Sequence, residues 1–542
     1  MLNTLNSFFP IRYTAFGLSV MGVLLSLFTL AGFGVGLPAL LLCMVLVGLG
    51  TYDVRQTKRS ILRNYPIIGH LRFMLEYVRP EIRQYFIESD SEAAPFSRAQ
   101  RSLVYQRAKG ESDKQPFGTQ LAVYAEGYEW MNHSVAPTRL GSHDFRLTIG
   151  ADCAQPYNAS IFNISAMSFG ALSANAILAL NAGAQRGGFA HDTGEGSISA
   201  HHRVHGGDLI WEVASGYFGC RDDEGSFNAF KFAANACDPQ VKMIELKLSQ
   251  GAKPGHGGML PGAKVTAEIA AARGVAEGVD CVSPAAHSAF TTPVKMMQFI
   301  ARLRELSGGK PTGFKLCIGH PWEWFAMVKA MQVTGITPDF IVVDGAEGGT
   351  GAAPLEFTDH VGSPLQEGLL LVHNTLRGVG LRDRIRIGCA GKVVSAFDIA
   401  RLMALGADWC NSARGFMFAL GCIQAHHCTS GLCPTGVTTQ DPLRQQSLVV
   451  SDKAERVFNF HQMTLHALKE LVQAAGLAHP RDITAHHIVR RTTDHKVQSL
   501  AQLILTQLPN GALLQEDLVG LPLIYQHHWP LASADRFSLL NQ

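Results

Sequence analysis

The sequence predicts an α/β protein in which a (β/α)8 barrel follows an N-terminal transmembrane helical hairpin and precedes a helical C-terminal tail. Short apolar runs alternate with Ala/Leu-rich runs from Ile161 onward, which is typical of repeated strand-then-helix units. Glycine clusters follow the strand-like runs, where a barrel places its active-site loops. Near the N-terminus, Tyr13–Tyr52 contains no charged residue and is long enough for two membrane helices.

The composition excludes several classes of protein. The 542 residues are 47% hydrophobic and 17% charged, and the formal net charge of only +2 argues against binding of nucleic acid through overall basic charge. The 54 glycines form no Gly-X-Y repeat and no low-complexity tract, so collagen-like and disordered chains are excluded. Three of the 11 cysteines crowd into one short segment, which favours a metal or cluster site over a disulfide framework, and therefore a reducing compartment.

A turn at Gly32–Pro38 divides the uncharged stretch into two helices, expected over about residues 14–31 and 37–52. The stretch is too long for the apolar core of a cleavable signal peptide, and a buried hairpin of a soluble protein is the alternative. Arg12 precedes the first helix, and the second is followed by Arg55, Lys58, Arg59 and Arg63. This bias places both ends in the cytoplasm, so we expect residues 1–59 to anchor the chain in the inner (cytoplasmic) membrane.

The barrel is expected over residues 156–440. Its clearest strand candidates are Ile161–Ala166, Lys242–Leu248, Phe314–Ile318, Phe340–Val343, Ile385–Ile387 and Asp408–Asn411. The helical patterns between them are Ala174–Gln185, Val294–Leu306, Trp322–Thr334 and Ala396–Leu405. Residues 60–155 form a polar and aromatic lead-in region, and residues 441–542 form a helical extension in which Ala454–Leu471 is strongly helix-like.

A cysteine-rich loop, Cys422-x5-Cys428-x4-Cys433, follows the last strand candidate. Each thiolate can supply one iron ligand, and three cysteines favour a three-iron cluster or a four-iron cluster with an open site. Zinc with His426 or His427 as the fourth ligand fits the spacing equally well, and simple buried cysteines are a third interpretation.

Two further loops carry groups suited to binding anions and moving protons. Lys247, Gln250 and Lys253 begin a glycine-rich segment at the end of a strand candidate, where they can form an anion and amide cradle. Glu195 lies between glycines in Asp192–Gly196 and suits proton transfer. The alternatives are ordinary turn chemistry for the cradle and a helix N-cap or solvated acid for Glu195.

Glycine-containing loops at Asp344–Gly351, Gly388–Lys392 and Ala413–Gly415 follow the later strand candidates. The last two follow what would be strands seven and eight, where barrels commonly bind a phosphate. Lys315 lies inside a strand and would place a cation in an apolar barrel, which is rare unless the charge is paired; a snorkelling structural lysine is the alternative. No Gly-x-Gly-x-x-Gly opens a βαβ unit and no Gly-x-Ser-x-Gly elbow occurs, so neither a dedicated dinucleotide domain nor a hydrolase is supported.

Five motifs, in this order, resemble the FMN-binding synthase domain of glutamate synthase. They are Ser165–Ser173, Asp192–Gly196, Gln250–Gly262, Glu347–Ala352 and the cysteine loop continued to Gln440. The resemblance covers about Ile161–Gln440. It implies an FMN-containing (β/α)8 barrel with a [3Fe–4S] cluster, which reduces the imine of 2-oxoglutarate and ammonia to L-glutamate. It also favours iron–sulfur over zinc for the three cysteines.

The resemblance implies roles for individual residues. Glu195 would be the carboxylate near the imine, and the residues that would hold the oxo-acid are Lys247, Gln250, Lys253 and Arg273. The implied FMN-binding residues are Ser165, Ser168, Lys315, Asp344, Gly348, Gly349, Thr350, Gly391, Lys392 and Arg414. Among these, Lys315 would stabilise negative charge at the N1/O2 edge of the flavin. Electrons would pass from a cluster on Cys422, Cys428 and Cys433 through FMN and leave as a hydride.

The sequence also departs from the family pattern. The chain begins with Met1 instead of a nucleophilic cysteine, so we expect ammonia to come from solution or from a separate glutaminase partner, and electrons from a donor protein. Met259 stands where the family usually has a glutamine, and Ser283–Ser288 replaces a more His-rich loop. One alternative is therefore an N-methylglutamate-synthase-like enzyme that uses another amine or oxo-acid. Another is a membrane-bound flavin and iron–sulfur electron-transfer subunit, which would need neither Glu195 nor the cradle.

Overall fold

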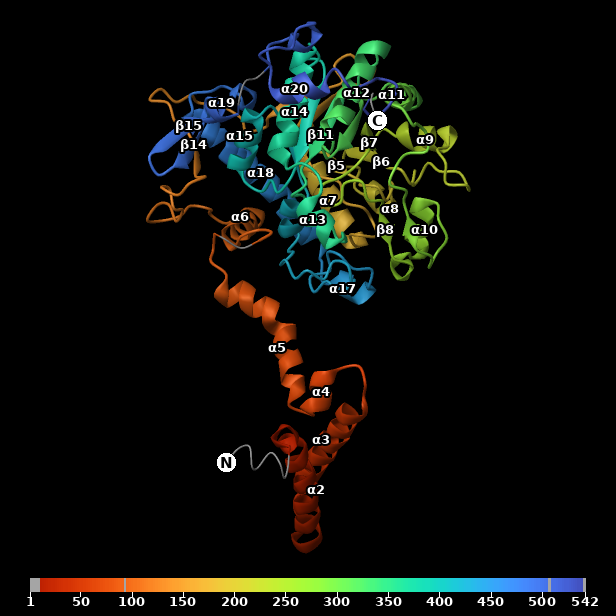
Figure 1. The fold of residues 1–542 in the computed structure, drawn as a ribbon, viewed down its shortest axis with the longest axis vertical. Helices are drawn as coiled ribbons and strands as arrows, with labels where there is room; N and C mark the ends of the chain where they lie inside the picture. The colour runs from red at the N-terminus through yellow and green to blue at the C-terminus, as the bar shows by residue number, and fades with distance from the viewer. Residues whose placement is uncertain (1–9, 92–93, 505–507, 540–542) are drawn as a thin grey trace. The chain divides into compact units, whose positions relative to one another are not determined.

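In the computed structural model, which describes residues 10–91, 94–504 and 508–539, the chain divides after Ala93 into two units. Met1–Ala93 contains the apolar helices, and Ala94–Gln542 contains the barrel (Figure 1). In the first unit, α2 (Thr14–Phe33) and α3 (Leu37–Arg55) form the expected helical hairpin, each ending a few residues later than predicted. Both are long and apolar enough to cross a membrane, and only 11% and 17% of their apolar windows are buried.

The hairpin is joined to further helices, α4 (Ser60–Asn64) and α5 (Gly69–Ile82), and to a π-helical turn at Arg83–Ile87. Asp53, in the last turn of α3, is fully buried. Its carboxylate accepts a hydrogen bond from the backbone N–H of Ile67 at 2.9 Å and lies 2.9 Å from His70 Nε2. These contacts fix the start of α5 against the end of α3.

Eight parallel strands close into a barrel, which confirms the predicted fold class. In order around the barrel they are β4 (Phe162–Ile164), β5 (His191–Asp192), β6 (Leu209–Val213), β7 (Val241–Lys247), β10 (Thr312–Leu316), β11 (Phe340–Asp344), β12 (Arg386–Ala390) and β13 (Trp409–Ser412). β13 pairs with β4 and completes the circle. Six strands overlap the predicted candidates. β5 and β6 were not among the candidates, because β5 has only two residues and β6 carries Glu212 in its apolar run.

Helices surround the strands in an outer layer (Figure 1). Those that the sequence predicts are α7 (Ala174–Gly187), α11 (Pro293–Leu306), α12 (Pro321–Thr334) and α15 (Ala396–Ala404). Side-chain caps set the starts of α7 and α15: Ser173 accepts a hydrogen bond from the backbone N–H of Ala176, and Ser395 forms a capping box with Asp398. The remaining helices of this part of the chain are α8 (Ala200–Arg203), α9 (Ala229–Ala236), α10 (Ala267–Arg273), α13 (Leu355–His360), α14 (Leu365–Gly378) and α16 (Arg414–Ala419).

The C-terminal region is helical and also contains a strand pair that the sequence analysis does not anticipate. α18 (Val450–Ala474) packs against α7 and against α6 (Arg98–Lys109), and shorter helices are α17 (Pro442–Gln446), α19 (Leu500–Leu503) and α20 (Leu523–His528). β14 (Ile488–Thr493) pairs with β15 (Lys496–Ser499) on one side and with β1 (Glu129–Met131) on the other. The lead-in region and the extension therefore share a sheet. Smaller antiparallel pairs join β2 (Arg146–Ile149) to β3 (Tyr157–Ser160), and β8 (Met259–Leu260) to β9 (Cys281–Val282).

Candidate active site

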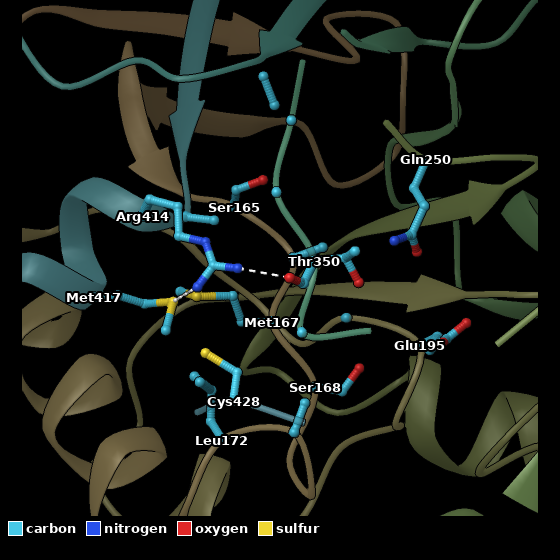
Figure 2. Close-up of a pocket in the computed structure, with 18 of the residues that line it drawn as sticks. Ser165, Met167, Ser168, Leu172, Glu195, Gln250, Thr350, Arg414, Met417 and Cys428 are labelled. Carbon is cyan, nitrogen blue, oxygen red and sulfur yellow. Dashed lines mark hydrogen bonds between the residues drawn. The ribbon is translucent and has the colours of Figure 1, made fainter. Parts of the chain in front are cut away.

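A cavity of about 210 Å³ lies at the carboxyl ends of the barrel strands. Every residue that the sequence analysis assigns to catalysis or to cofactor binding lines it: Ser165, Ser168, Glu195, Lys247, Gln250, Lys253, Arg273, Lys315, Asp344, Gly348, Gly349, Thr350, Gly391, Lys392 and Arg414. Figure 2 shows several of them facing the same space. They come from every part of the barrel sequence, and they meet because parallel strands bring their following loops to one rim.

The loops after β11 and β13 are tied together at this rim. Arg414, the first residue of α16, donates a hydrogen bond from Nη2 to the backbone oxygen of Thr350 at 2.8 Å (Figure 2). A Cβ on Gly349 would lie 2.8 Å from Arg414 Nε, so a side chain at Gly349 would displace the guanidinium. Gly194 adopts a φ of +63°, and a Cβ there would lie 2.7 Å from the backbone nitrogen of Ser168. These glycines leave bare backbone facing the cavity.

A chain of charged side chains runs from the cavity into the barrel. Lys247 Nζ lies 2.8 Å from Glu195 Oε2 and 3.6 Å from Glu212 Oε1. Glu212 Oε2 in turn lies 2.8 Å from Lys315 Nζ. The sequence suggested an apolar barrel interior around Lys315, but the structure places the carboxylate of Glu212 beside it. Lys315 is buried and paired, so it does not snorkel to solvent.

The ionisation of these groups follows from their pairing. Burial disfavours charge on Glu195, but the ammonium of Lys247, helped by Lys253 and Arg273, lowers its pKa to about 2. Burial likewise opposes charge on Lys247, and the carboxylates of Glu195 and Glu212 raise its pKa. Glu195 and Lys247 are thus both ionised at neutral pH, and they face the cavity as a closed ion pair.

Lys247, Lys253 and Arg273 form what we call the cationic rim. Lys253 has no ion pair of its own in the described part of the chain, and burial lowers its pKa. Arg273 ends α10, stacks 5.1 Å from the ring centroid of Phe218, and donates to the backbone oxygen of Phe169 at 3.2 Å. Three cations beside one carboxylate leave the rim with an excess of positive charge, which suits a ligand carrying carboxylates.

The cysteine loop lines a second cavity of about 1050 Å³, and Cys428 lines both cavities. Burial raises the pKa of Cys422 to about 11, whereas hydrogen bonds involving Thr435 and Thr438 outweigh burial and lower the pKa of Cys433. All three thiols line this second cavity.

The two departures from the family pattern also lie at this site. Met259 is 57% exposed and lines both cavities. His287, in the altered loop, is buried; its Nε2 lies 2.8 Å from the backbone oxygen of Lys247 and its Nδ1 lies 3.0 Å from the hydroxyl of Tyr217. Met259 thus faces the ligand space, while His287 supports the backbone of a rim residue.

Several lining residues were not predicted. Glu212 bridges two of the predicted lysines, and a charged residue inside the apolar run Leu209–Val213 is the same signal that singled out Lys315. Phe96 lines both cavities although it lies far before the barrel in sequence, and no local pattern marks it. Asn411 lines the first cavity from the last strand.

Comparison with known proteins agrees with this picture. Residues 147–478 match the family model described as the conserved region in glutamate synthase. The chain is 37% identical over 493 residues to the glutamate synthase large subunit-like protein YerD of Bacillus subtilis, covering 83% of this chain and 94% of that protein. It is 38% identical over 315 residues to an archaeal glutamate synthase [NADPH] of Methanocaldococcus jannaschii, covering 58% of each.

Among solved structures, one of mandelate oxidase aligns with a TM-score of 0.39 at 13% identity, covering 71% of this chain and 94% of that one. The sequence relatives and the family model carry the assignment. The matched region spans the whole barrel, the cysteine loop and every residue that lines the first cavity except Phe96. The chain therefore belongs to the glutamate synthase family.

Proposed function

We propose that the chain is a glutamate-synthase-like oxidoreductase that reduces the imine of 2-oxoglutarate and ammonia to L-glutamate. The observation that carries this proposal is the convergence on one cavity of the cationic rim, an ionised Glu195 and the glycine loops of the later strands. A scaffold or a pure electron carrier has no need of a preorganised carboxylate beside three cations.

The cationic rim suits a dicarboxylate oxo-acid. Lys247, Lys253 and Arg273 supply positive charge, and Gln250 supplies an amide that can donate to one oxygen and accept from another group. Glu195 is the anion among them, so it attracts a positively charged iminium nitrogen and orients it. Its Oε2 already accepts a hydrogen bond from Lys247 Nζ, so the ion pair holds the carboxylate in place beside the substrate nitrogen.

The loops of the later strands fit FMN. Lys392 and Arg414 follow the seventh and eighth strands and would hold its phosphate, and the bare backbone at Gly348 and Gly349 leaves room against the cavity wall. Lys315 would lie at the ring. Bound there, FMN would supply the hydride that the imine carbon accepts.

We propose an iron–sulfur cluster on Cys422, Cys428 and Cys433, of the [3Fe–4S] type implied by three ligands. Cys428 belongs to both cavities, which suits electron delivery from a cluster to a flavin. An electron-donor protein would reduce the cluster, and a separate glutaminase would supply ammonia.

We also propose that α2 and α3 anchor the chain in the inner (cytoplasmic) membrane, with the catalytic domain in the cytoplasm. Their length and composition support this, as does the cluster of basic residues that follows them. The domain boundaries after residues 59, 155 and 440 remain predictions. Extraction of membranes with alkaline carbonate tests the anchor, because a spanning protein stays with the lipid and a peripheral one is released.

A second candidate is the same chemistry with an alkylated amine. Met259 favours it, because its exposed thioether faces the cavities at a position where the family usually has an amide. An apolar contact there suits a methyl group on the nitrogen better than a free N–H.

Reoxidation of the reduced protein tests both candidates. The full chain is purified anaerobically in detergent, reduced, and mixed with 2-oxoglutarate together with ammonium, methylammonium or glutamine. We expect a flavin spectrum that recovers only when 2-oxoglutarate and one amine are both present, and that amine identifies the nitrogen donor. Flavin that no mixture reoxidises would overturn the oxo-acid assignment, and absence of flavin would overturn the catalytic proposal.

A further inference from the structure

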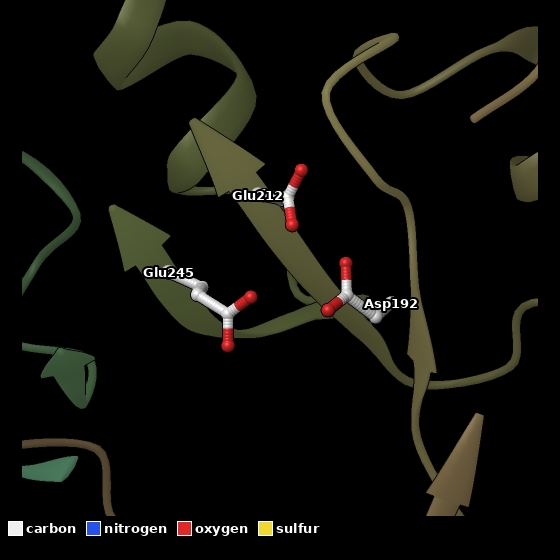
Figure 3. A group of neighbouring side chains, drawn as sticks. All are labelled: Asp192, Glu212 and Glu245. Atoms are coloured by element: carbon white, nitrogen blue, oxygen red, sulfur yellow. The ribbon is translucent and has the colours of Figure 1, made fainter. Parts of the chain in front are cut away.

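Three carboxylates gather inside the barrel below the cavity. Asp192, Glu212 and Glu245 come from the neighbouring strands β5, β6 and β7 and point toward one another (Figure 3). One carboxylate oxygen of each residue lies within 4.8 Å of one oxygen of each of the other two, and all three side chains are buried. We call them the floor carboxylates. Glu212 lines the cavity, whereas Asp192 and Glu245 lie beyond its lining.

The register of the strands forces this gathering. Glu212 on β6 is the direct neighbour of Glu245 on β7, and Lys247 on β7 is the direct neighbour of Lys315 on β10. Because Glu245 and Lys247 are two residues apart, they share the inner face of the barrel. Like charges on directly neighbouring strand residues are destabilising. The barrel nevertheless contains two such pairs, one of glutamates and one of lysines.

Lys315 and Lys247 compensate part of this charge. Lys315 Nζ lies 2.8 Å from Glu212 and 3.9 Å from Glu245. Asp192 accepts a hydrogen bond from the backbone N–H of Gly194 at 2.9 Å. No donor among the described residues reaches either oxygen of Glu245, and the carboxyl of Asp192 lies beside it. A hydrogen bond between these two carboxyl groups requires a proton between them.

Such a trio is also a ligand set for a divalent cation. Here the ammonium of Lys315 already lies among the carboxylates and supplies the positive charge that a metal would bring. The ionisation behaviour agrees with a shared proton: burial and the neighbouring carboxylates raise the pKa of both Asp192 and Glu245, although Lys315 partly opposes this.

We propose that Asp192 and Glu245 share one proton between their carboxyl groups. This pair takes up a second proton when the cavity above it gains negative charge. The proposal rests on the proposed function, because the ligand that gains negative charge is the flavin on its reduction. When the flavin accepts two electrons from a reductant such as dithionite, at most one additional proton passes from solvent to the pair, which goes from singly to doubly protonated. No side chain is oxidised or reduced. Glu212 and Lys315 transmit the effect, since Glu212 is the floor carboxylate that also lines the cavity.

The first measurement needs no flavin. A carboxyl whose pKa is raised by folding keeps its proton over a pH range in which the unfolded chain has lost it, so stability falls as pH rises through that range. We expect denaturant midpoints of the full chain in detergent to fall between about pH 5 and pH 8, and the double variant D192N/E245Q to lose part of that slope. Equal slopes would overturn the proton-sharing pair.

The second measurement is the pH dependence of the midpoint potential of bound FMN. We expect this pH dependence to show that wild type takes up as many as one proton more per flavin reduced than the double variant D192N/E245Q takes up. Asp398 provides a matched control, because burial raises its pKa but it caps α15 away from the cavity. D398N should change stability and leave the potential's pH dependence unchanged. Single variants D192N and E245Q guard against failure of the double variant to fold.

The outcomes separate this inference from the proposed function. If the flavin binds and no amine reoxidises it, the proposed reaction fails while the potential still reports on the pair. If wild type and D192N/E245Q show the same pH dependence, the pair does not respond to charge in the cavity and the inference fails. If no FMN binds, the response to flavin falls together with the proposed function, and the stability slopes alone decide whether the pair holds a proton.

Discussion

The cationic rim and the floor carboxylates are two charged clusters within the same barrel, and they treat ionisation in opposite ways. At the rim, Glu195 is held below its usual pKa by Lys247, and the pair faces the cavity. At the floor, burial and the charge of neighbouring carboxylates hold the pKa values of Asp192 and Glu245 above their usual range. Ion pairing thus wins where a cation is within 3 Å, and desolvation wins where carboxylates outnumber ammonium groups. We propose that the ionised rim groups bind the ligand and that the floor pair responds to its charge.

Removing the rim carboxylate should have the largest effect. E195Q keeps the shape of the side chain but loses its charge, so the substrate nitrogen loses its anionic partner. We expect the rate of glutamate formation to fall by about 10²–10⁴-fold while FMN remains bound. Single-turnover reoxidation of the flavin measures this, with E305Q on the exposed end of α11 as the control. An E195Q rate close to wild type would remove Glu195 from the chemistry.

Removing the lysine between rim and floor should mainly affect stability. K315M leaves Glu212 and Glu245 without their nearest ammonium, and breaking a buried ion pair from one side costs about 3–5 kcal/mol. K253M removes a rim cation that has no ion pair of its own and should cost at most about 1 kcal/mol. Denaturant unfolding of the two variants measures the contrast. Equal losses would show that the floor is no more dependent on its cation than the rim.

The pH dependence of stability should have opposite signs in the two clusters. Folding lowers the pKa of Glu195 to about 2, so its ion pair stabilises the fold fully when the pH is above the pKa of the unfolded chain. This stabilisation is lost as the pH falls from the unfolded pKa to the folded pKa of about 2. At about 1.4 kcal/mol per pKa unit, wild type should exceed E195Q by about 3 kcal/mol at neutral pH, and by less as the pH falls below about 4. A difference that does not change with pH would mean that Glu195 is not titrating as an ion-paired group.

The smallest effect should come from Met259 at the edge of the rim. M259Q restores a polar side chain where the methionine is now half-exposed, so the preference between ammonium and methylammonium should shift toward ammonium by about tenfold. Competition between the two amines in one reaction, with products separated by mass, measures the ratio. An unchanged ratio would remove Met259 from selection of the amine.

The sequence predicts the rim much better than the floor. Glu195, Gln250 and Lys253 lie in glycine-marked loops after strands, and the barrel topology brings such loops together without further information. The floor depends on which residues of β6 and β7 lie side by side, and that register places Glu212 against Glu245. Glu212, inside the apolar run Leu209–Val213, was the one feature of the sequence that could have indicated the floor. The same residue interrupts the apolar pattern, so the run was not predicted as a strand.

Long-range pairing explains the other shortfall in the prediction of the fold. β14 and β15 are short strands of mixed polarity, and β14 pairs with β1, more than three hundred residues earlier in the chain. Neither segment shows a continuous apolar run, so its sheet depends on the partner and not on local pattern. The apolar helices α2 and α3, by contrast, depend on composition alone and were predicted within a few residues.

Incorporation of labelled nitrogen tests the central claim most directly. The reduced full chain is given 2-oxoglutarate and ¹⁵N-ammonium in the absence of glutamine, and the amino acids are analysed by mass spectrometry. We expect ¹⁵N-glutamate in amounts that match the flavin reoxidised, and almost none with E195Q. Flavin reoxidation without labelled glutamate, or equal labelling with E195Q, would contradict it.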